Sequence, residues 1–229
     1  MMSKFEAILF DVDGTLLDFD KTEREALENT FMELDIQPTE DNFAAYMEAN
    51  SSLWDMLEQG QIEKDKLKTE RFRLFLKRIN VKRDVDNASN TYIRHLSNSY
   101  FIIDGAMEIC RKLKGRYNLA IVTNGIAEVQ KSRAMLSGLA DIFEHSFISE
   151  DVGFAKPQKE YFDYVFEKMS IKNPDKVLIV GDSLTSDIKG GNNAKIKTCW
   201  YNPHGKQNNT DSVCDYEIKS LHEIEDILV

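Results

Sequence analysis

Cysteine and histidine are scarce in this chain of 229 residues, which contains three cysteines and four histidines. Cys110, Cys199 and Cys214 are scattered, odd in number and without CxxC spacing. Neither a disulfide framework nor a zinc site is therefore expected. We expect these cysteines to act as small buried apolar residues in a reducing cytosol.

Long apolar runs and basic runs are missing as well. No stretch approaches the length of a membrane span, and the apolar run before Asp11 is too short for a signal sequence. The 39 acidic and 29 basic residues give a net charge of −10, which disfavours nucleic-acid polymers and anionic membranes as partners. We expect a cytoplasmic protein without membrane association, and the sequence leaves its oligomeric state open.

The sequence does contain a short apolar stretch that runs directly into two acidic residues. Residues 7–10 predict a strand buried on both faces, and Asp11, Asp13 and the turn-forming Gly14 follow it. Open α/β sheets bind ligands at the carboxyl ends of their strands. Because residues two apart in a strand share one side, the two carboxylates repel unless a cation or a shared proton intervenes. Oxygen ligands without a nearby Cys or His favour Mg²⁺, and a solvated acidic turn is the alternative.

Three later segments also present polar groups at the ends of structural elements. Two of them follow predicted strands at residues 119–122 and 177–180, and one precedes a helix that Pro157 opens. Hydroxyl and backbone N–H groups after the first of these strands can bind an anion. The polar residues of the three segments are Thr123, Asn124, Gly125, Lys156, Asp182 and Asp187.

Residues 18–98 show helical periodicity throughout. Apolar side chains recur there at the spacing of amphipathic helices. Since this block interrupts an α/β pattern, we expect it to form an inserted all-helical cap domain, with residues 1–17 and 99–229 forming the core domain. The four expected helices include residues 26–34, 43–57, 72–79 and 92–96.

Strands and helices alternate from residue 100 onward, which predicts an α/β fold with a parallel sheet. A solvated face is expected for Glu128, Gln130 and Arg133 on the helix after Gly125, with Arg133 alternatively holding the loop after Asn124. The remaining elements expected here are a helix at 106–114, strands at 147–148, 195–201 and 216–218, and a terminal helix.

The order of these motifs is similar to that of the haloacid dehalogenase (HAD) superfamily of phosphohydrolases. The resemblance implies a Rossmann-like core with a helical cap, Mg²⁺ as cofactor, and hydrolysis of phosphate monoesters through an aspartyl-phosphate. The four motifs are residues 8–16, 121–125, 156–157 and 181–187. Further stretches, at residues 49–54, 148–157 and 198–200, resemble the YjjG-like pyrimidine 5'-nucleotidases.

The resemblance also implies roles for the acidic residues. Asp11 is expected to attack phosphorus as the nucleophile, and Asp13 to protonate the leaving oxygen and later to activate water. The Asp11 carboxylate, the Asp13 backbone carbonyl and Asp182 are expected to bind Mg²⁺. Asp187 is expected to be an outer-shell partner or a water-mediated ligand.

The remaining motif residues are expected to bind or orient the phosphoryl group. Thr123 and the backbone of Asn124 and Gly125 would hold a phosphoryl oxygen, and Lys156 would stabilise the charge of the transition state. Thr15 is expected to orient Asp13, and Gly14 to allow close approach of the backbone.

Substrate selection is expected in the cap. Asn50 and Trp54 lie four apart on one helical face, so one could hydrogen-bond a base while the other stacks on it. Phe19 could line the mouth of the site. Ordinary packing is the alternative for all three.

Lys195 stands where the resemblance implies a glycine at the end of a helix. We expect the left-handed position to have moved, or the loop to differ, because a left-handed lysine would be strained.

The predicted function is hydrolysis of (deoxy)pyrimidine nucleoside monophosphates. A phosphatase of sugar phosphates or other small metabolites, and a sugar phosphomutase, are the alternatives. A non-catalytic binding module is disfavoured because Asp11, Asp13, Lys156 and Asp182 are all present.

Overall fold

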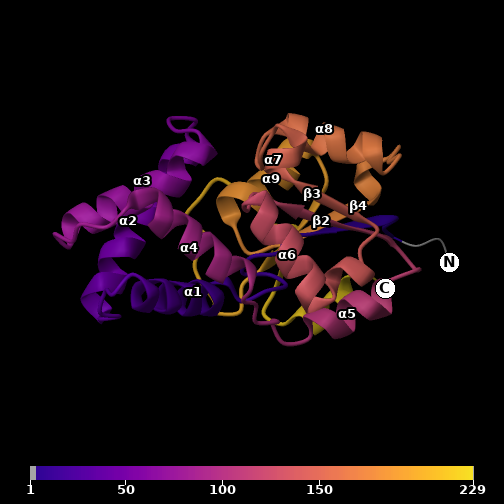
Figure 1. Cartoon of the computed structure of the whole chain (residues 1–229). Helices are drawn as coiled ribbons and strands as arrows, with labels where there is room; N and C mark the ends of the chain where they lie inside the picture. Colours follow the sequence, from indigo (N-terminus) through magenta and orange to yellow (C-terminus); the bar gives the residue numbers. More distant parts are fainter. Residues whose placement is uncertain (1–3, 229) are drawn as a thin grey trace. The chain divides into compact units, whose positions relative to one another are not determined.

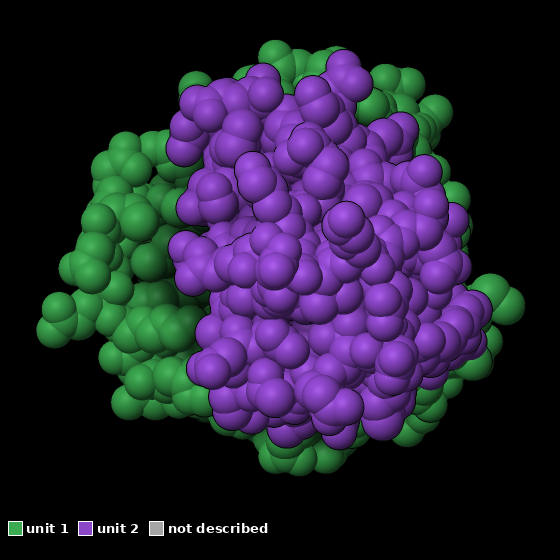
Figure 2. Space-filling model, turned by 60° about the vertical axis from the view of Figure 1, so that its left-hand side comes forward, with its two compact units in different colours: residues 1–19, 100–229 green, residues 20–99 purple. Residues whose placement is uncertain are grey.

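The structure, a computed structural model, describes residues 4–228. The chain divides into two compact units, which Figure 2 colours separately. One unit comprises the residues up to Phe19 and those from Tyr100 onward, and the other comprises residues 20–99. The roles of these units as catalytic core and cap remain predictions.

The first unit is built on a six-stranded sheet with the order β3-β2-β1-β4-β5-β6. Figure 1 labels three of these strands, β2, β3 and β4. Every neighbouring pair of strands is parallel. The predicted α/β class and parallel sheet are therefore confirmed. The strands are β1 (Ala7–Phe10), β2 (Asn118–Thr123), β3 (His145–Ile148), β4 (Val177–Gly181), β5 (Lys197–Tyr201) and β6 (Tyr216–Ile218).

Both faces of this sheet are buried, because alternate residues of each central strand enter different cores. Ile8 and Phe10 of β1 pack into one core with helix α5, whereas Ala7 and Leu9 pack into the other with helix α8. Side chains that alternate across a strand explain why the strands read as continuous apolar runs. The helices of this unit are α5 (Ala106–Leu113), α6 (Ala127–Ser137), α7 (Ser149–Val152), α8 (Lys159–Lys168), α9 (Lys189–Ala194) and α10 (Ile224–Ile227), with short turns η1 (Leu139–Asp141), η2 (Pro174–Lys176), η3 (Leu184–Ile188) and η4 (Leu221–Glu223).

The second unit contains helices, as the periodicity predicts, and they pack around aromatic side chains. The rings of Phe31 and Phe75 stack with centroids 5.0 Å apart, and Tyr46 contacts Phe72 and Tyr92. Thr39 caps its helix by accepting a hydrogen bond from the Asn42 backbone N–H. The long helices are α1 (Phe19–Glu33), α2 (Glu40–Glu58), α3 (Lys64–Arg78) and α4 (Val85–Ser97).

The cysteines are free thiols within the described residues, and the expected burial holds for two of the three. Cys110 and Cys199 are buried, and Cys214 is half-buried. Among residues 4–228 there is also no helix with the length and apolarity needed to cross a membrane.

Lys195 adopts the left-handed conformation at the end of α9, with φ +58° and ψ +38°. The expectation that this position had moved was therefore wrong. The helix needs a left-handed residue where it meets the start of β5. With Lys195 in this conformation, two backbone N–H groups cap the helix: that of Lys195 donates to the Asn192 carbonyl, and that of Ile196 donates to the Gly191 carbonyl.

We expect Lys195→Gly to stabilise the protein by about 0.5–1 kcal/mol, because the strain of a left-handed side chain exceeds the extra freedom of glycine in the unfolded state. Urea unfolding measures the change. Lys131→Gly, at an exposed position inside α6, is the matched control and should destabilise by about 1 kcal/mol. Equal destabilisation by both variants would contradict the prediction.

Candidate active site

Asp11 and Asp182 meet at the carboxyl edge of the sheet because their strands are neighbours. β1 and β4 pair in parallel with Phe10 opposite Val180, and the Asp11 backbone N–H donates to the Val180 carbonyl at 2.9 Å. Each acid follows its strand directly. The sheet register therefore brings together two carboxylates that lie far apart in the sequence.

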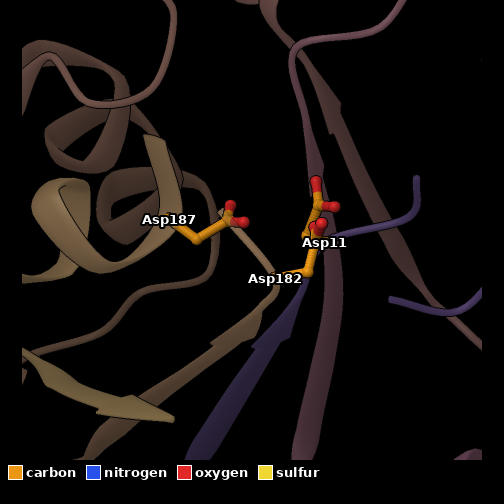
Figure 3. Close-up of side chains that lie close together, drawn as sticks. All are labelled: Asp11, Asp182 and Asp187. Atoms are coloured by element: carbon orange, nitrogen blue, oxygen red, sulfur yellow. The ribbon is translucent and has the colours of Figure 1, made fainter. Parts of the chain in front are cut away.

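A third carboxylate, that of Asp187, completes an acidic cluster. Asp187 lies on η3, is fully buried, and accepts a hydrogen bond from the Ser183 backbone N–H at 3.1 Å. Figure 3 shows its side chain pointing toward Asp11 and Asp182. Carboxylate oxygens of the three residues lie within 4.8 Å of one another.

Two glycines make room for this cluster. A Cβ atom on Gly181 would lie 2.2 Å from Oδ2 of Asp187, and one on Gly14 would lie 2.6 Å from Oδ2 of Asp182. Gly14 also has a φ of +82°, a conformation that favours glycine. The turn after β1 can therefore pass close to Asp182 only with glycine at position 14.

Lys156 is buried within hydrogen-bonding distance of two of the three acids. Its Nζ donates to Oδ1 of Asp11 and to Oδ1 of Asp187, each at 2.6 Å, and to the Val122 carbonyl at 2.8 Å. The residue is only 3% exposed. All three ammonium protons thus have acceptors.

Asn124 fixes the backbone of Lys156. Its Nδ2 donates to the Lys156 carbonyl at 2.8 Å, and its Oδ1 accepts from the Lys156 backbone N–H at 2.9 Å. The loop after β2 thereby holds the segment that carries the lysine. The sequence pointed to the backbone of Asn124, not to this use of its side chain.

The two threonines of the motifs are also buried: Thr123 ends β2, and Thr15 lies in the turn after β1. Thr123 Oγ1 accepts from the Gly125 backbone N–H at 3.0 Å. Thr15 was expected to orient Asp13, but its hydroxyl donates to Oδ1 of Asp182 at 3.4 Å. The difference arises because Gly14 turns the chain toward the end of β4.

Burial and mutual repulsion shift the pKa values of the acids. Burial, followed by the charge of Asp187, raises the pKa of Asp11 well above its usual value. The same two causes raise the pKa of Asp182 to about 7. Burial alone would lower the pKa of Lys156, but Asp11 and Asp187 outweigh it and raise that pKa.

The donor set fits a divalent metal ion. When all three acids are ionised, Lys156 balances one of three negative charges and leaves two uncompensated. Carboxylate oxygens without His or Cys are the ligands that Mg²⁺ prefers. The acidic cluster can thus hold a metal ion that relieves the repulsion.

Asp13 points to helix α6 and lies outside the acidic cluster. Its Oδ1 accepts from Nη1 of Arg133 at 2.6 Å, and its Oδ2 accepts from Nε2 of Gln130 at 2.5 Å. The expected solvated face is right for Glu128, which is exposed, and wrong for the other two. Arg133 is fully buried and Gln130 is 4% exposed, because each binds a carboxylate oxygen. Their i, i+3 spacing was the signal in the sequence.

The residues expected to select substrate lie in different environments. The Phe19 ring faces Arg133, whose guanidinium carbon is 5.7 Å from the ring centroid. In the helical unit, Asn50 is buried, with Nδ2 donating to Glu23 at 3.0 Å and Oδ1 accepting from Arg71 at 3.4 Å. Trp54 is half-exposed. The Asn50 amide is thus engaged within its own unit, and a role in selecting substrate stays a prediction for all three residues.

Comparison with known protein families identifies the family of this chain. The model of the haloacid dehalogenase-like hydrolases matches residues 5–195. The chain belongs to this family. The chain is therefore a hydrolase, and the predicted family is confirmed.

Relatives similar over the whole length include phosphatases with a nucleotide substrate in their names. The chain is 41% identical to the HAD-hydrolase YfnB of Bacillus subtilis, over 99% of this chain and 97% of the relative. It is 36% identical to the pyrimidine 5'-nucleotidase PynA of Streptococcus pneumoniae, over 98% and 95% of the two chains. For the pyrimidine 5'-nucleotidase YjjG of Escherichia coli the identity is 33%, over 98% of each chain. These relatives confirm the predicted enzyme class, a phosphatase.

A crystal structure of YfnB bound to magnesium matches the fold of this chain. The TM-score is 0.92 at 41% identity, over 98% of this chain and 99% of the other. The predicted HAD-type α/β architecture is thus confirmed.

We expect Asp182→Asn to stabilise the metal-free protein, because it removes one of three mutually repelling acids, two of which are buried. The same variant should lose most of the stabilisation by Mg²⁺, which for wild type is about 2.7 kcal/mol at a hundred times Kd. Thermal unfolding with and without Mg²⁺ measures both effects. Asp163→Asn, on the exposed surface of α8, is the control and should leave both unchanged. A full Mg²⁺ effect in Asp182→Asn would contradict the assignment.

Proposed function

We propose that this protein is a Mg²⁺-dependent 5'-nucleotidase that hydrolyses pyrimidine nucleoside monophosphates through an aspartyl-phosphate. The chemistry rests on one observation, the buried Asp11 carboxylate held at the end of β1 by the Lys156 ammonium. The substrate class rests on the two pyrimidine 5'-nucleotidases that match this chain over 98% of its length. A cytoplasmic location stays a prediction.

Phosphoryl transfer to the enzyme is the first half of the proposed reaction. A carboxylate oxygen of Asp11 forms a bond to phosphorus while the bond from phosphorus to the 5'-oxygen breaks. Asp13 gives its proton to that oxygen, and the nucleoside leaves as the neutral alcohol. Lys156 stabilises the charge that builds up on the phosphoryl oxygens.

Hydrolysis of the aspartyl-phosphate is the second half. Asp13, now a carboxylate, takes a proton from water as the water oxygen attacks phosphorus. The bond from Asp11 to phosphorus breaks, inorganic phosphate leaves, and both aspartates return to their starting states. Thr123 and the backbone N–H groups of Asn124 and Gly125 orient the phosphoryl group in both halves.

Mg²⁺ would be held by the carboxylates of Asp11 and Asp182 and by the backbone carbonyl of Asp13, with Asp187 behind them. When bound, it offsets the repulsion between the Asp11 carboxylate and the phosphate. The metal-binding acids and Lys156 would thus both allow the Asp11 carboxylate to approach the negatively charged phosphate.

We expect Asp11→Asn to lower turnover by more than about 10⁴-fold, as loss of a catalytic nucleophile does elsewhere. Asp13→Asn should lower it by about 10²–10⁴-fold and leave Mg²⁺ binding intact, since its backbone carbonyl remains. Phosphate release and Mg²⁺ titration calorimetry measure the two properties. Asp151→Asn, an exposed acid of α7 paired with Lys131, is the control. Retained turnover in Asp11→Asn would refute the nucleophile.

A substrate panel tests the proposed specificity. With Mg²⁺, we expect kcat/KM for uridine, deoxyuridine and thymidine monophosphates to exceed that for purine monophosphates and sugar phosphates. The measurement is release of inorganic phosphate by wild type, with Asp11→Asn as the blank. A preference for sugar phosphates would leave the core mechanism in place and reject the nucleotidase. Retention of the phosphoryl group without release would indicate a phosphomutase.

A further inference from the structure

Arg133 is a buried cation in the middle of α6 that the mechanism above does not use. It is fully buried. Burying a charge is costly, and replacing a buried ion pair by apolar side chains is often neutral or stabilising. Packing alone is therefore a weak reason for an arginine at this position.

Among the described residues, Asp13 is the charged partner of Arg133. Nη1 of Arg133 donates to Oδ1 of Asp13 at 2.6 Å. Its Nε and Nη2 are buried and have no hydrogen-bond partner in the part of the chain that the structure describes. The guanidinium thus gains its compensation from a single carboxylate oxygen, one that belongs to the site.

Gln130 binds the other oxygen of the same carboxylate. It precedes Arg133 by three residues, so the two side chains leave α6 on one face. Its Nε2 donates to Oδ2 of Asp13 at 2.5 Å. Gly125 leaves space for this side chain, since a Cβ atom there would lie 2.0 Å from Nε2 of Gln130.

We infer that Gln130 and Arg133 are positioning residues that fix the Asp13 carboxylate for proton transfer. The inference rests on the proposed function, in which Asp13 protonates the leaving oxygen. The Asp13 side chain is 25% exposed and would otherwise be free to turn, whereas a helix presents both donors from fixed positions. One bond to each oxygen leaves further lone pairs for the transferred proton.

Two substrates with different leaving groups distinguish a loss of proton transfer from a general structural defect, which would slow both reactions equally. A nucleoside 5'-oxygen needs a proton as it leaves, whereas p-nitrophenolate leaves as the anion. The ratio kcat/KM reports the steps up to departure of the leaving group. We expect Arg133→Met to lower kcat/KM for uridine monophosphate by about 10–100-fold, and for p-nitrophenyl phosphate by about threefold or less.

Three further variants separate the effects of charge, of the second hydrogen bond and of an unrelated change in the same helix. Arg133→Lys retains the charge and should recover part of the loss on the nucleotide. Gln130→Met removes the weaker bond, should show the same bias to a smaller degree, and tests the inference even if Arg133→Met fails to fold. Lys131→Met is the matched control, because it removes an exposed cation from the same helix, and it should change neither ratio.

A double variant completes the experiment. In an Asp13→Asn background, Arg133→Met should cause little further loss on the nucleotide, because both changes remove one function. Additive losses, or equal losses on the two esters, would overturn the inference. If wild type hydrolyses neither ester, the proposed function itself fails.

Discussion

The site depends on one buried ammonium group placed between two buried carboxylates. Asp11 and Asp187 repel each other, and burial strengthens that repulsion. Lys156 lies between them and bonds to both at 2.6 Å. The carbonyl of Val122 and the side chain of Asn124 fix the lysine in turn. A single charge thus joins the end of β1, the end of β2, turn η3 and the segment before α8.

Much of this arrangement follows from local features of the sequence. Residues 7–10 predict a strand buried on both faces, which places the acids after it at a sheet edge, and the structure has this strand. The apolar runs before Thr123 and Asp182 likewise predict buried strands that end at a sheet edge. Because parallel strands in one sheet end at one edge, the order of the motifs was enough to gather them.

The interactions that sequence reasoning missed join residues far apart in the chain. Gln130 and Arg133 looked like an exposed face because their helix has few apolar residues to mark its buried side. Only the fold brings them to Asp13, well over a hundred residues away. Lys195 shows the opposite case. Lysine disfavours the left-handed conformation, but α9 ends and β5 begins so close together that Lys195 between them must adopt it.

Gly14 and Gly181 lie so close to the acids that neither position has space for a methyl group. Replacing glycine by alanine is a common way to stiffen a protein, since it restricts the unfolded chain. At these two positions the added carbon would displace Asp182 or Asp187. The space that only glycine leaves beside the acids is therefore a condition for their placement, and engineering for heat resistance would have to seek its gains elsewhere in the chain.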